Sequence, residues 1–119
     1  MEEKILIKDA PNEHVMLIGN MAMTRACLES GIQFVSQYPG TPVTDMGTYF
    51  SRLCSTRSVP GLYFQWASNE SASITAAAGA SWCGVKSLAI MKHVGANVAA
   101  DALSTIALNG PTSADGRGG

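Results

Sequence analysis

The sequence predicts one α/β domain built on a doubly wound, parallel sheet that is incomplete. Segments with helical spacing alternate with short apolar segments, and this alternation implies right-handed crossovers between parallel strands. At 119 residues, 46% hydrophobic and 14% charged, the chain has room for one compact core. Only three strands are predicted, and such a small parallel sheet leaves two long edges unpaired.

The first half of the chain predicts two helices around one strand. Apolar side chains recur at helical spacing over residues 19–30, and Gly31 follows where a C-cap glycine would stand. Residues 32–38 are β-branched and aromatic, and they predict a buried strand. A second helix is expected over residues 42–53, with Pro42 in its first turn.

The next predicted unit is a strand followed by an alanine-rich helix. Residues 61–66 predict the strand, and residues 71–82 predict the helix. Ser68 or Asn69 can cap this helix by accepting a hydrogen bond from a free backbone N–H group. Because its side chains are small, we expect the helix to approach the sheet or another helix closely.

The last predicted elements are a third strand over residues 86–91 and a fourth helix over residues 98–108. Residues 111–119 hold glycine and polar residues but no large apolar side chain, so we expect this tail to be disordered and to add no strand. The expected organisation is therefore a partial domain over residues 1–110 followed by a disordered tail.

Charge and cysteine content exclude several classes of protein. The formal net charge of -1 provides no basic face for nucleic acid and no polybasic patch for lipid. Residues 1–10 contain neither the apolar core of a signal peptide nor a membrane span, so a cytoplasmic protein is expected. Three well-separated cysteines are too few for a four-cysteine cluster, so any iron–sulfur ligands would lie elsewhere.

Polar residues gather at the predicted carboxyl ends of the strands, where parallel sheets bind ligands. The segments are residues 38–42, 67–70 and 92–97. Taken singly, each has an ordinary interpretation: a tight turn at the first, a helix-dipole carboxylate at Glu70, and either a hydrogen-bonded or a site histidine at His93. Their common location at one edge is more informative than any one of them.

The two tryptophans and the familiar catalytic motifs add little to this prediction. Trp82 is expected in the core, and Trp66 either in the core or at the wall of a pocket. The sequence contains no dinucleotide-binding glycine fingerprint, no phosphate-binding lysine loop, no zinc-protease helix motif and no nucleophile elbow. Without a family, the sequence indicates an incomplete α/β domain with one polar ligand-binding edge.

The same residues resemble the first domain of a known enzyme family over nearly all of residues 15–110. The match is to thiamine-diphosphate-dependent 2-oxoacid:ferredoxin oxidoreductases, and most of all to the alpha subunits of indolepyruvate ferredoxin oxidoreductases. The resemblance rests on Gly19-Asn20, Tyr38-Pro39-Gly40-Thr41-Pro42, Trp66 with Asn69-Glu70, Met91-Lys92-His93-Val94-Gly95, Asn97-Val98-Ala99 and Asp101. The run from Met91 to Ala99 favours the indolepyruvate branch over the pyruvate branch. Two residues depart from the pattern: Met21 replaces an acidic residue, and Ala102 a proline.

The resemblance implies a fold, a reaction and a set of partners. The fold would be the pyrimidine-binding domain of a thiamine-diphosphate enzyme. The complete enzyme, with a beta subunit, would decarboxylate an aryl 2-oxoacid, pass the acyl group to coenzyme A and deliver electrons through 4Fe-4S clusters to ferredoxin. The Gly-Asp-Gly segment that would hold Mg and the diphosphate does not occur in this sequence, and neither do the cluster cysteines. We therefore expect an inactive fragment with no metal ligands of its own.

The resemblance also implies roles for individual residues. Glu70 aligns with the carboxylate that hydrogen-bonds the aminopyrimidine ring nitrogen and so promotes loss of the thiazolium proton. The other implied contacts are to the cofactor, by Gly40, Thr41 and Asn69, and to the substrate, by Thr41, His93 and Asn97. Two alternatives stay open: a fragment of a pyruvate or other 2-oxoacid ferredoxin oxidoreductase, and a non-catalytic α/β interaction module.

Overall fold

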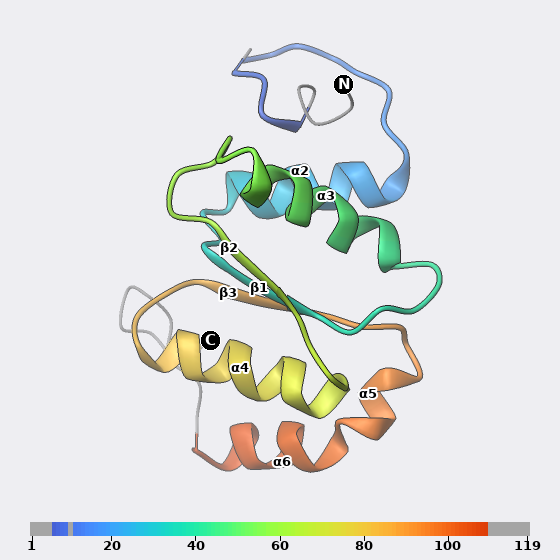
Figure 1. Cartoon of the computed structure of the whole chain (residues 1–119), viewed down its shortest axis with the longest axis vertical. Coiled ribbons are helices and arrows are strands. Elements are labelled where there is room, and N and C mark those ends of the chain that lie inside the picture. The colour runs from blue at the N-terminus through green and yellow to red at the C-terminus, as the bar shows by residue number, and fades with distance from the viewer. Residues whose placement is uncertain (1–5, 10, 110–119) are drawn as a thin grey trace.

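The structure, a computed structural model, describes residues 6–9 and 11–109. They form three layers, with a sheet between two layers of helices (Figure 1). The predicted tail over 111–119, and Gly110 at the end of the predicted domain, lie outside the described residues. Within the described part of the chain, no helix is long and apolar enough to cross a membrane. The elements are α2 (Gly19–Glu29), β1 (Phe34–Gln37), α3 (Thr44–Ser55), β2 (Tyr63–Trp66), α4 (Glu70–Trp82), β3 (Ser87–Ile90), α5 (Gly95–Val98) and α6 (Ala100–Asn109).

The sheet has three strands in the order β2-β1-β3, and both pairings are parallel. In the centre of the sheet, Val35 lies opposite Phe64 on one side and Leu88 on the other. Helices α2 and α3 cover one face, and α4 and α6 lie on the other (Figure 1). The predicted fold class, a small doubly wound parallel sheet flanked by helices, is therefore confirmed.

The apolar core lies between the sheet and the α2/α3 layer. One cluster joins α2 and α3 through the buried residues Leu6, Met21, Tyr49 and Leu53. The other cluster joins α3 to β1 and β3 through the buried residues Val35, Met46, Phe50 and Ile90. Large apolar side chains thus cover most of this face of the sheet.

Small residues form the contact between α4 and the opposite face. Ser73, Ala77 and Ala78 are buried there, and the Ser73 hydroxyl donates a hydrogen bond of 2.8 Å to the carbonyl of Ser36 in β1. Because these side chains are short, the backbone of α4 comes close to the sheet, as the alanine-rich sequence predicts. Helix α6 packs on the outside of α4 and has no buried residue.

Two predicted helix boundaries are wrong. Helix α3 begins at Thr44 and not at Pro42, because the Gly40 carbonyl accepts hydrogen bonds from both Val43 N and Thr44 N and closes a turn first. The helix predicted over residues 98–108 starts earlier and is divided into α5 and α6, since the chain bends at the buried Ala99.

The prediction that Trp82 lies in the core is also wrong, and Trp66 is only partly covered. Trp82 is 50% exposed: it is the last residue of α4, and it lines an open hollow between α4 and α6. Trp66 is 42% exposed. Its ring lies against Gly47 of α3 and meets Phe64 edge-on at a centroid distance of 5.0 Å, so it covers the α3 side of the sheet end.

Candidate functional site

The three polar segments leave the carboxyl ends of parallel strands, and two close contacts join them at that edge. A Cβ atom placed on Gly40, after β1, would lie 3.2 Å from the Cβ of Lys92, after β3. A Cβ atom placed on Gly95 would lie 2.6 Å from the Cγ of Glu70, at the start of α4. The segment after β3 therefore contacts both of the others. A side chain at Gly95 would displace Glu70, whereas one at Gly40 would meet Lys92 in a tight contact.

The loop after β1 is anchored from three directions. The Gly40 N–H donates to the Thr44 hydroxyl at 3.0 Å, which ties the loop to α3. The Asn20 side chain, at the start of α2, donates to the Pro42 carbonyl at 2.9 Å. The Gln37 side chain donates to the neighbouring Val43 carbonyl at 2.8 Å. Thr41 lies exposed between these anchors, with a cis peptide bond to Pro42.

Gln37 is the residue in this region that sequence reasoning missed. It is fully buried at the end of β1, and its Oε1 has no hydrogen-bond partner among the described residues. The available signal was a pair of polar residues, Ser36 and Gln37, at the end of a strand predicted to be buried, because burial of an amide is costly unless it forms hydrogen bonds. The structure shows that its Nε2 holds the loop, while its Oε1 lies 2.7 Å from the position of a Cβ on Gly47.

Glu70 is positioned by the cap of α4. Of the two predicted caps, Asn69 is the one used: its backbone is extended, and its Oδ1 accepts from the Ala72 N–H at 2.8 Å. Glu70 follows as the first helical residue and is half-buried. Its carboxylate therefore lies where the N–H groups and the positive end of the helix dipole favour negative charge.

The other predicted site residues lie at the same end of the sheet. His93 is in the loop after β3 and Asn97 is in α5, and both side chains are exposed. Thr41 and Asn69 are exposed, and Gly40 is half-buried. Across residues 6–9 and 11–109, no group of histidine, cysteine, aspartate or glutamate side chains is arranged to hold a metal ion. Roles for these residues in binding stay predictions.

A family model and several curated proteins match this chain. Residues 25–108 match the family of thiamine-diphosphate-binding domains of pyruvate flavodoxin/ferredoxin oxidoreductases. The indolepyruvate oxidoreductase subunit IorA of Archaeoglobus fulgidus is 40% identical over 106 residues, which is 88% of this chain and 17% of that subunit. IorA of Methanothermobacter marburgensis is 37% identical over 110 residues, or 92% of this chain and 17% of the subunit.

A more distant relative is the 2-oxoglutarate synthase subunit KorA of Methanocaldococcus jannaschii. It is 36% identical over 70 residues, which is 59% of this chain and 18% of that subunit. The chain thus spans less than a fifth of the length of each of these relatives. No solved structure gives a significant match.

Proposed function

The chain belongs to the thiamine-diphosphate-binding family of pyruvate flavodoxin/ferredoxin oxidoreductases, and from this premise we propose that it is the pyrimidine-binding part of an indolepyruvate oxidoreductase. The observation that carries the proposal is the contact between Glu70 and Gly95, which holds a half-buried carboxylate at the ligand-binding edge of the sheet. The relatives named indolepyruvate oxidoreductase cover about nine tenths of the chain, and they support this substrate.

The residues at this edge fit one end of thiamine diphosphate. A carboxylate at a helix start, next to a loop with no side chain at Gly95, can accept a hydrogen bond from a protonated ring nitrogen of an aminopyrimidine. When bound, the cofactor supplies the chemistry that removes carbon dioxide from a 2-oxoacid. The contribution of Glu70 is to hold and release the proton at that ring nitrogen, as a positioned acid–base group.

The loop residues have complementary roles in this proposal. Gly40 and Asn69 complete the cofactor-binding edge, since Gly40 allows the first loop to approach Lys92 and Asn69 fixes the first turn of α4. Thr41, His93 and Asn97 are exposed donors at the same end of the sheet. A hydroxyl, an imidazole and an amide are suited to binding the carboxylate and keto oxygen of a 2-oxoacid.

The complete reaction requires parts outside this chain. We propose that the whole enzyme acts in the cytoplasm, where it oxidises its oxoacid to an acyl-coenzyme A and passes electrons through 4Fe-4S clusters to ferredoxin. Mg, the diphosphate and the clusters would then be held by other segments and by a beta subunit. The isolated chain is expected to be inactive. Turnover of indolepyruvate by the purified chain, with coenzyme A and ferredoxin, would contradict this.

The match to KorA favours a second substrate, 2-oxoglutarate, for the same fold and cofactor. The test is a chimera in which this chain replaces the matching segment of the Archaeoglobus IorA subunit, assayed with indolepyruvate, pyruvate and 2-oxoglutarate. Preference for indolepyruvate in the chimera supports the first proposal. Because the chimera keeps the remaining IorA segments, a shift toward 2-oxoglutarate would be attributable to this chain.

The chimera also tests Glu70. Glu70→Gln should lower turnover about 10²- to 10⁴-fold and slow exchange of the thiazolium C2 proton, because glutamine keeps the size but cannot exchange a proton. Glu29→Gln is the matched control, since Glu29 is exposed on α2 and pairs with Arg25. A carboxylate that only complements the helix dipole would instead change stability by about 0.3–1 kcal/mol and leave proton exchange unchanged.

A binding experiment separates the enzyme proposal from a non-catalytic interaction module. The full chain is titrated with thiamine while backbone amide signals are followed by NMR. Shifts at Glu70, Gly40 and Gly95 that are largely kept in Glu70→Gln, whose amide can still hydrogen-bond the ring, lost in Glu70→Ala and kept in Glu29→Ala, support pyrimidine binding. No shifts at any thiamine concentration, from a chain whose spectrum is that of a folded protein, would favour the interaction module.

A further inference from the structure

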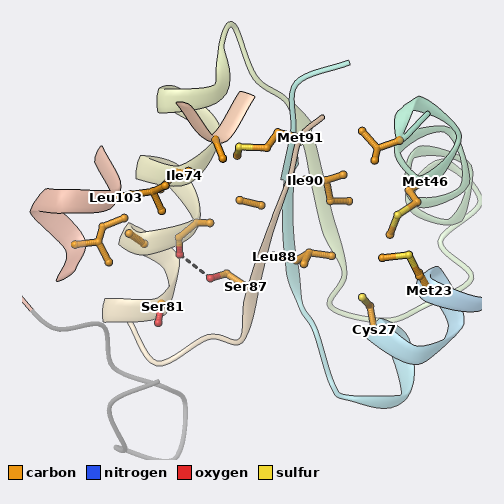
Figure 2. A pocket seen from close by; sticks show the side chains of 16 residues that line it. Met23, Cys27, Met46, Ile74, Ser81, Ser87, Leu88, Ile90, Met91 and Leu103 are labelled. Carbon is orange, nitrogen blue, oxygen red and sulfur yellow. Dashed lines mark hydrogen bonds between the residues drawn. The ribbon is translucent and has the colours of Figure 1, made fainter. Parts of the chain in front are cut away.

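One buried polar side chain, that of Gln37, ties the loop after β1 to the sheet. Gln37 is the last residue of β1, is fully buried, and is the largest of the four polar side chains that the described part of the chain buries. Its partner in register on β3 is Ile90. Figure 2 shows the Ile90 side chain directed toward the layer of α2 and α3. Because residues in register on neighbouring strands share a face of the sheet, the Gln37 amide enters the same layer.

The Gln37 amide closes the loop over residues 38–43. Its Nε2 donates a hydrogen bond of 2.8 Å to the carbonyl of Val43, the last residue before α3. Inside the loop, the Val43 N–H donates to the Gly40 carbonyl, also at 2.8 Å. The end of the strand and the start of the helix are therefore held together, with the exposed Thr41 between them.

The Val43 carbonyl also fixes which way the amide faces. Turning the amide over would bring its oxygen against that carbonyl oxygen, and neither atom can donate a hydrogen bond. Oε1 therefore lies on the other side, beside Gly47 of α3, where it has no hydrogen-bond partner among the described residues. A Cβ atom at Gly47 would lie 2.7 Å from Oε1 and 2.8 Å from Cζ3 of Trp66. The absence of a side chain at Gly47 thus leaves room for both the amide and the indole ring.

The fold by itself gains little from an amide at this position. A buried amide with an unpaired acceptor is less favourable than an apolar side chain of the same length, such as methionine. Without the amide, the Val43 carbonyl would still accept from the Met46 N–H at 3.1 Å. The other two anchors of the loop, from Asn20 and to Thr44, come from the helical layer. The contribution that only the amide makes is a directed hydrogen bond from the sheet to the loop.

We propose that Gln37 is a positioning residue for the substrate: it holds the loop so that the Thr41 hydroxyl stays in place to bind the 2-oxoacid. This inference rests on the proposed function, in which Thr41 contacts the substrate. Gln37 is fully buried, so it acts through the loop and not by contact with the oxoacid. Glu70 belongs to α4, on the opposite face of the sheet (Figure 1), so proton exchange at the cofactor should not depend on Gln37.

The first measurement follows the loop in the full chain by NMR. Gln37→Met should shift the backbone amide signals of Gly40 and Thr41. The signal of Glu70, on the other face, should stay in place. The thermal midpoint should change little, because methionine fills the space and removes the unpaired acceptor. Gln33→Met is the matched control, since Gln33 is exposed and stands just before the other end of β1, and it should move neither loop signal.

The second measurement uses the chimera with the Archaeoglobus IorA subunit. Gln37→Met should raise KM for indolepyruvate about tenfold, which is the effect of one misplaced hydrogen bond, and leave kcat within about twofold. Exchange of the thiazolium C2 proton should keep its rate. A residue that only supports the fold would instead lower the thermal midpoint and leave KM unchanged. Gln33→Met should change neither.

A double variant decides whether Gln37 acts through Thr41. Thr41→Val removes the hydroxyl and should itself raise KM. Gln37→Met in that background should add less than about twofold, because the group that it positions is already absent. Two independent effects that multiply would overturn the proposal.

Three further outcomes would also overturn it. They are an unchanged KM in Gln37→Met, unchanged loop signals, and loss of folding in both Gln37→Met and Gln37→Leu, which would show that the fold itself requires the amide. A chimera without substitutions that turns over no oxoacid would contradict the proposed function and this inference together. An active chimera whose KM does not respond to Gln37→Met would contradict this inference alone.

Discussion

The two faces of the sheet are built from different kinds of side chain. On the α2/α3 face, Phe50, Leu53 and Val35 are fully buried in clusters of large apolar residues. On the α4 face, the small side chains of Ser73 and Ala77 let the helix lie close to the strands. The contact there includes a hydrogen bond from the Ser73 hydroxyl to the Ser36 carbonyl. The α2/α3 face therefore removes more apolar surface from water. The α4 face instead sets the distance between the backbone of α4 and that of the strands.

This difference teaches how the candidate site is placed. Glu70 belongs to α4, so its position depends on the small contacts that hold α4 against β1, together with the Asn69 cap. Thr41 belongs to the other layer, because its loop is tied to α2 through Asn20 and to α3 through Thr44. The site therefore lies where the two layers meet at the sheet edge. Changes to the α2/α3 face should act mainly on the free energy of unfolding. Changes to the α4 face should act mainly on the position of Glu70.

The largest expected effect comes from the apolar face. Phe50→Ala should lower the free energy of unfolding by about 3–5 kcal/mol, because it removes a fully buried aromatic side chain from the second cluster and leaves a cavity. Urea denaturation measures the change. Leu108→Ala, at a position that is 88% exposed, is the control and should change stability by less than about 0.5 kcal/mol. Equal effects of the two would show that the core lies elsewhere.

A pair of glycine substitutions compares the two faces directly. Gly47→Ala in α3 should destabilise the chain by about 1–3 kcal/mol, because the new Cβ would overlap the Trp66 ring and lie 2.7 Å from Gln37 Oε1. Gly79→Ala in α4 meets nothing within 4 Å and should stabilise the helix by about 0.5–1 kcal/mol. Thermal unfolding of both variants checks the signs. The same sign for both would mean that helix propensity outweighs the contact with Trp66.

The hydrogen bond between α4 and β1 should have a smaller effect. Ser73→Ala should cost about 1–2 kcal/mol, because it removes the buried donor to the Ser36 carbonyl. Ser36→Ala should be near neutral, since the Ser36 hydroxyl is buried without a hydrogen-bond partner among the described residues. Urea denaturation compares the two. Amide signals of Glu70 and Gly95 should move only in Ser73→Ala, and their movement in both variants would contradict the proposed role of Ser73 in holding α4.

The smallest effect concerns Cys27, a half-buried residue of α2 that packs against the apolar cluster of Val35, Met46, Phe50 and Ile90. Burial raises the pKa of the Cys27 thiol, so the folded chain keeps this proton to higher pH than the unfolded chain. The associated stability is present below the ordinary thiol pKa of about 8.5 and is lost as pH rises through the raised value. Alkylation of Cys27, measured against pH in the Cys54→Ser, Cys83→Ser variant, should require higher pH in the folded chain than in urea. Identical pH profiles in both conditions would contradict the raised pKa.

Much of the fold follows from local sequence patterns. The three strands lie within the predicted segments 32–38, 61–66 and 86–91, because short, mostly apolar runs bounded by glycine, proline or polar residues favour buried strands. The helix that begins at Glu70 was marked by a capping residue and by alanine content, both of which act within one or two turns. The location of polar segments at one edge follows from the parallel arrangement of the strands.

Tertiary structure decided what depends on residues far apart in the chain. The order β2-β1-β3, the burial of the Gln37 amide, the contact of Trp66 with Gly47 and that of Gly95 with Glu70 all join segments separated by many residues. Sequence periodicity reports which side of an element is apolar, but not which other element will cover it. The bend at Ala99 has the same origin, since a helical pattern over 98–108 continues until packing buries that residue. The sequence alone determined the elements and the polar edge, whereas long-range packing determined which residues meet there.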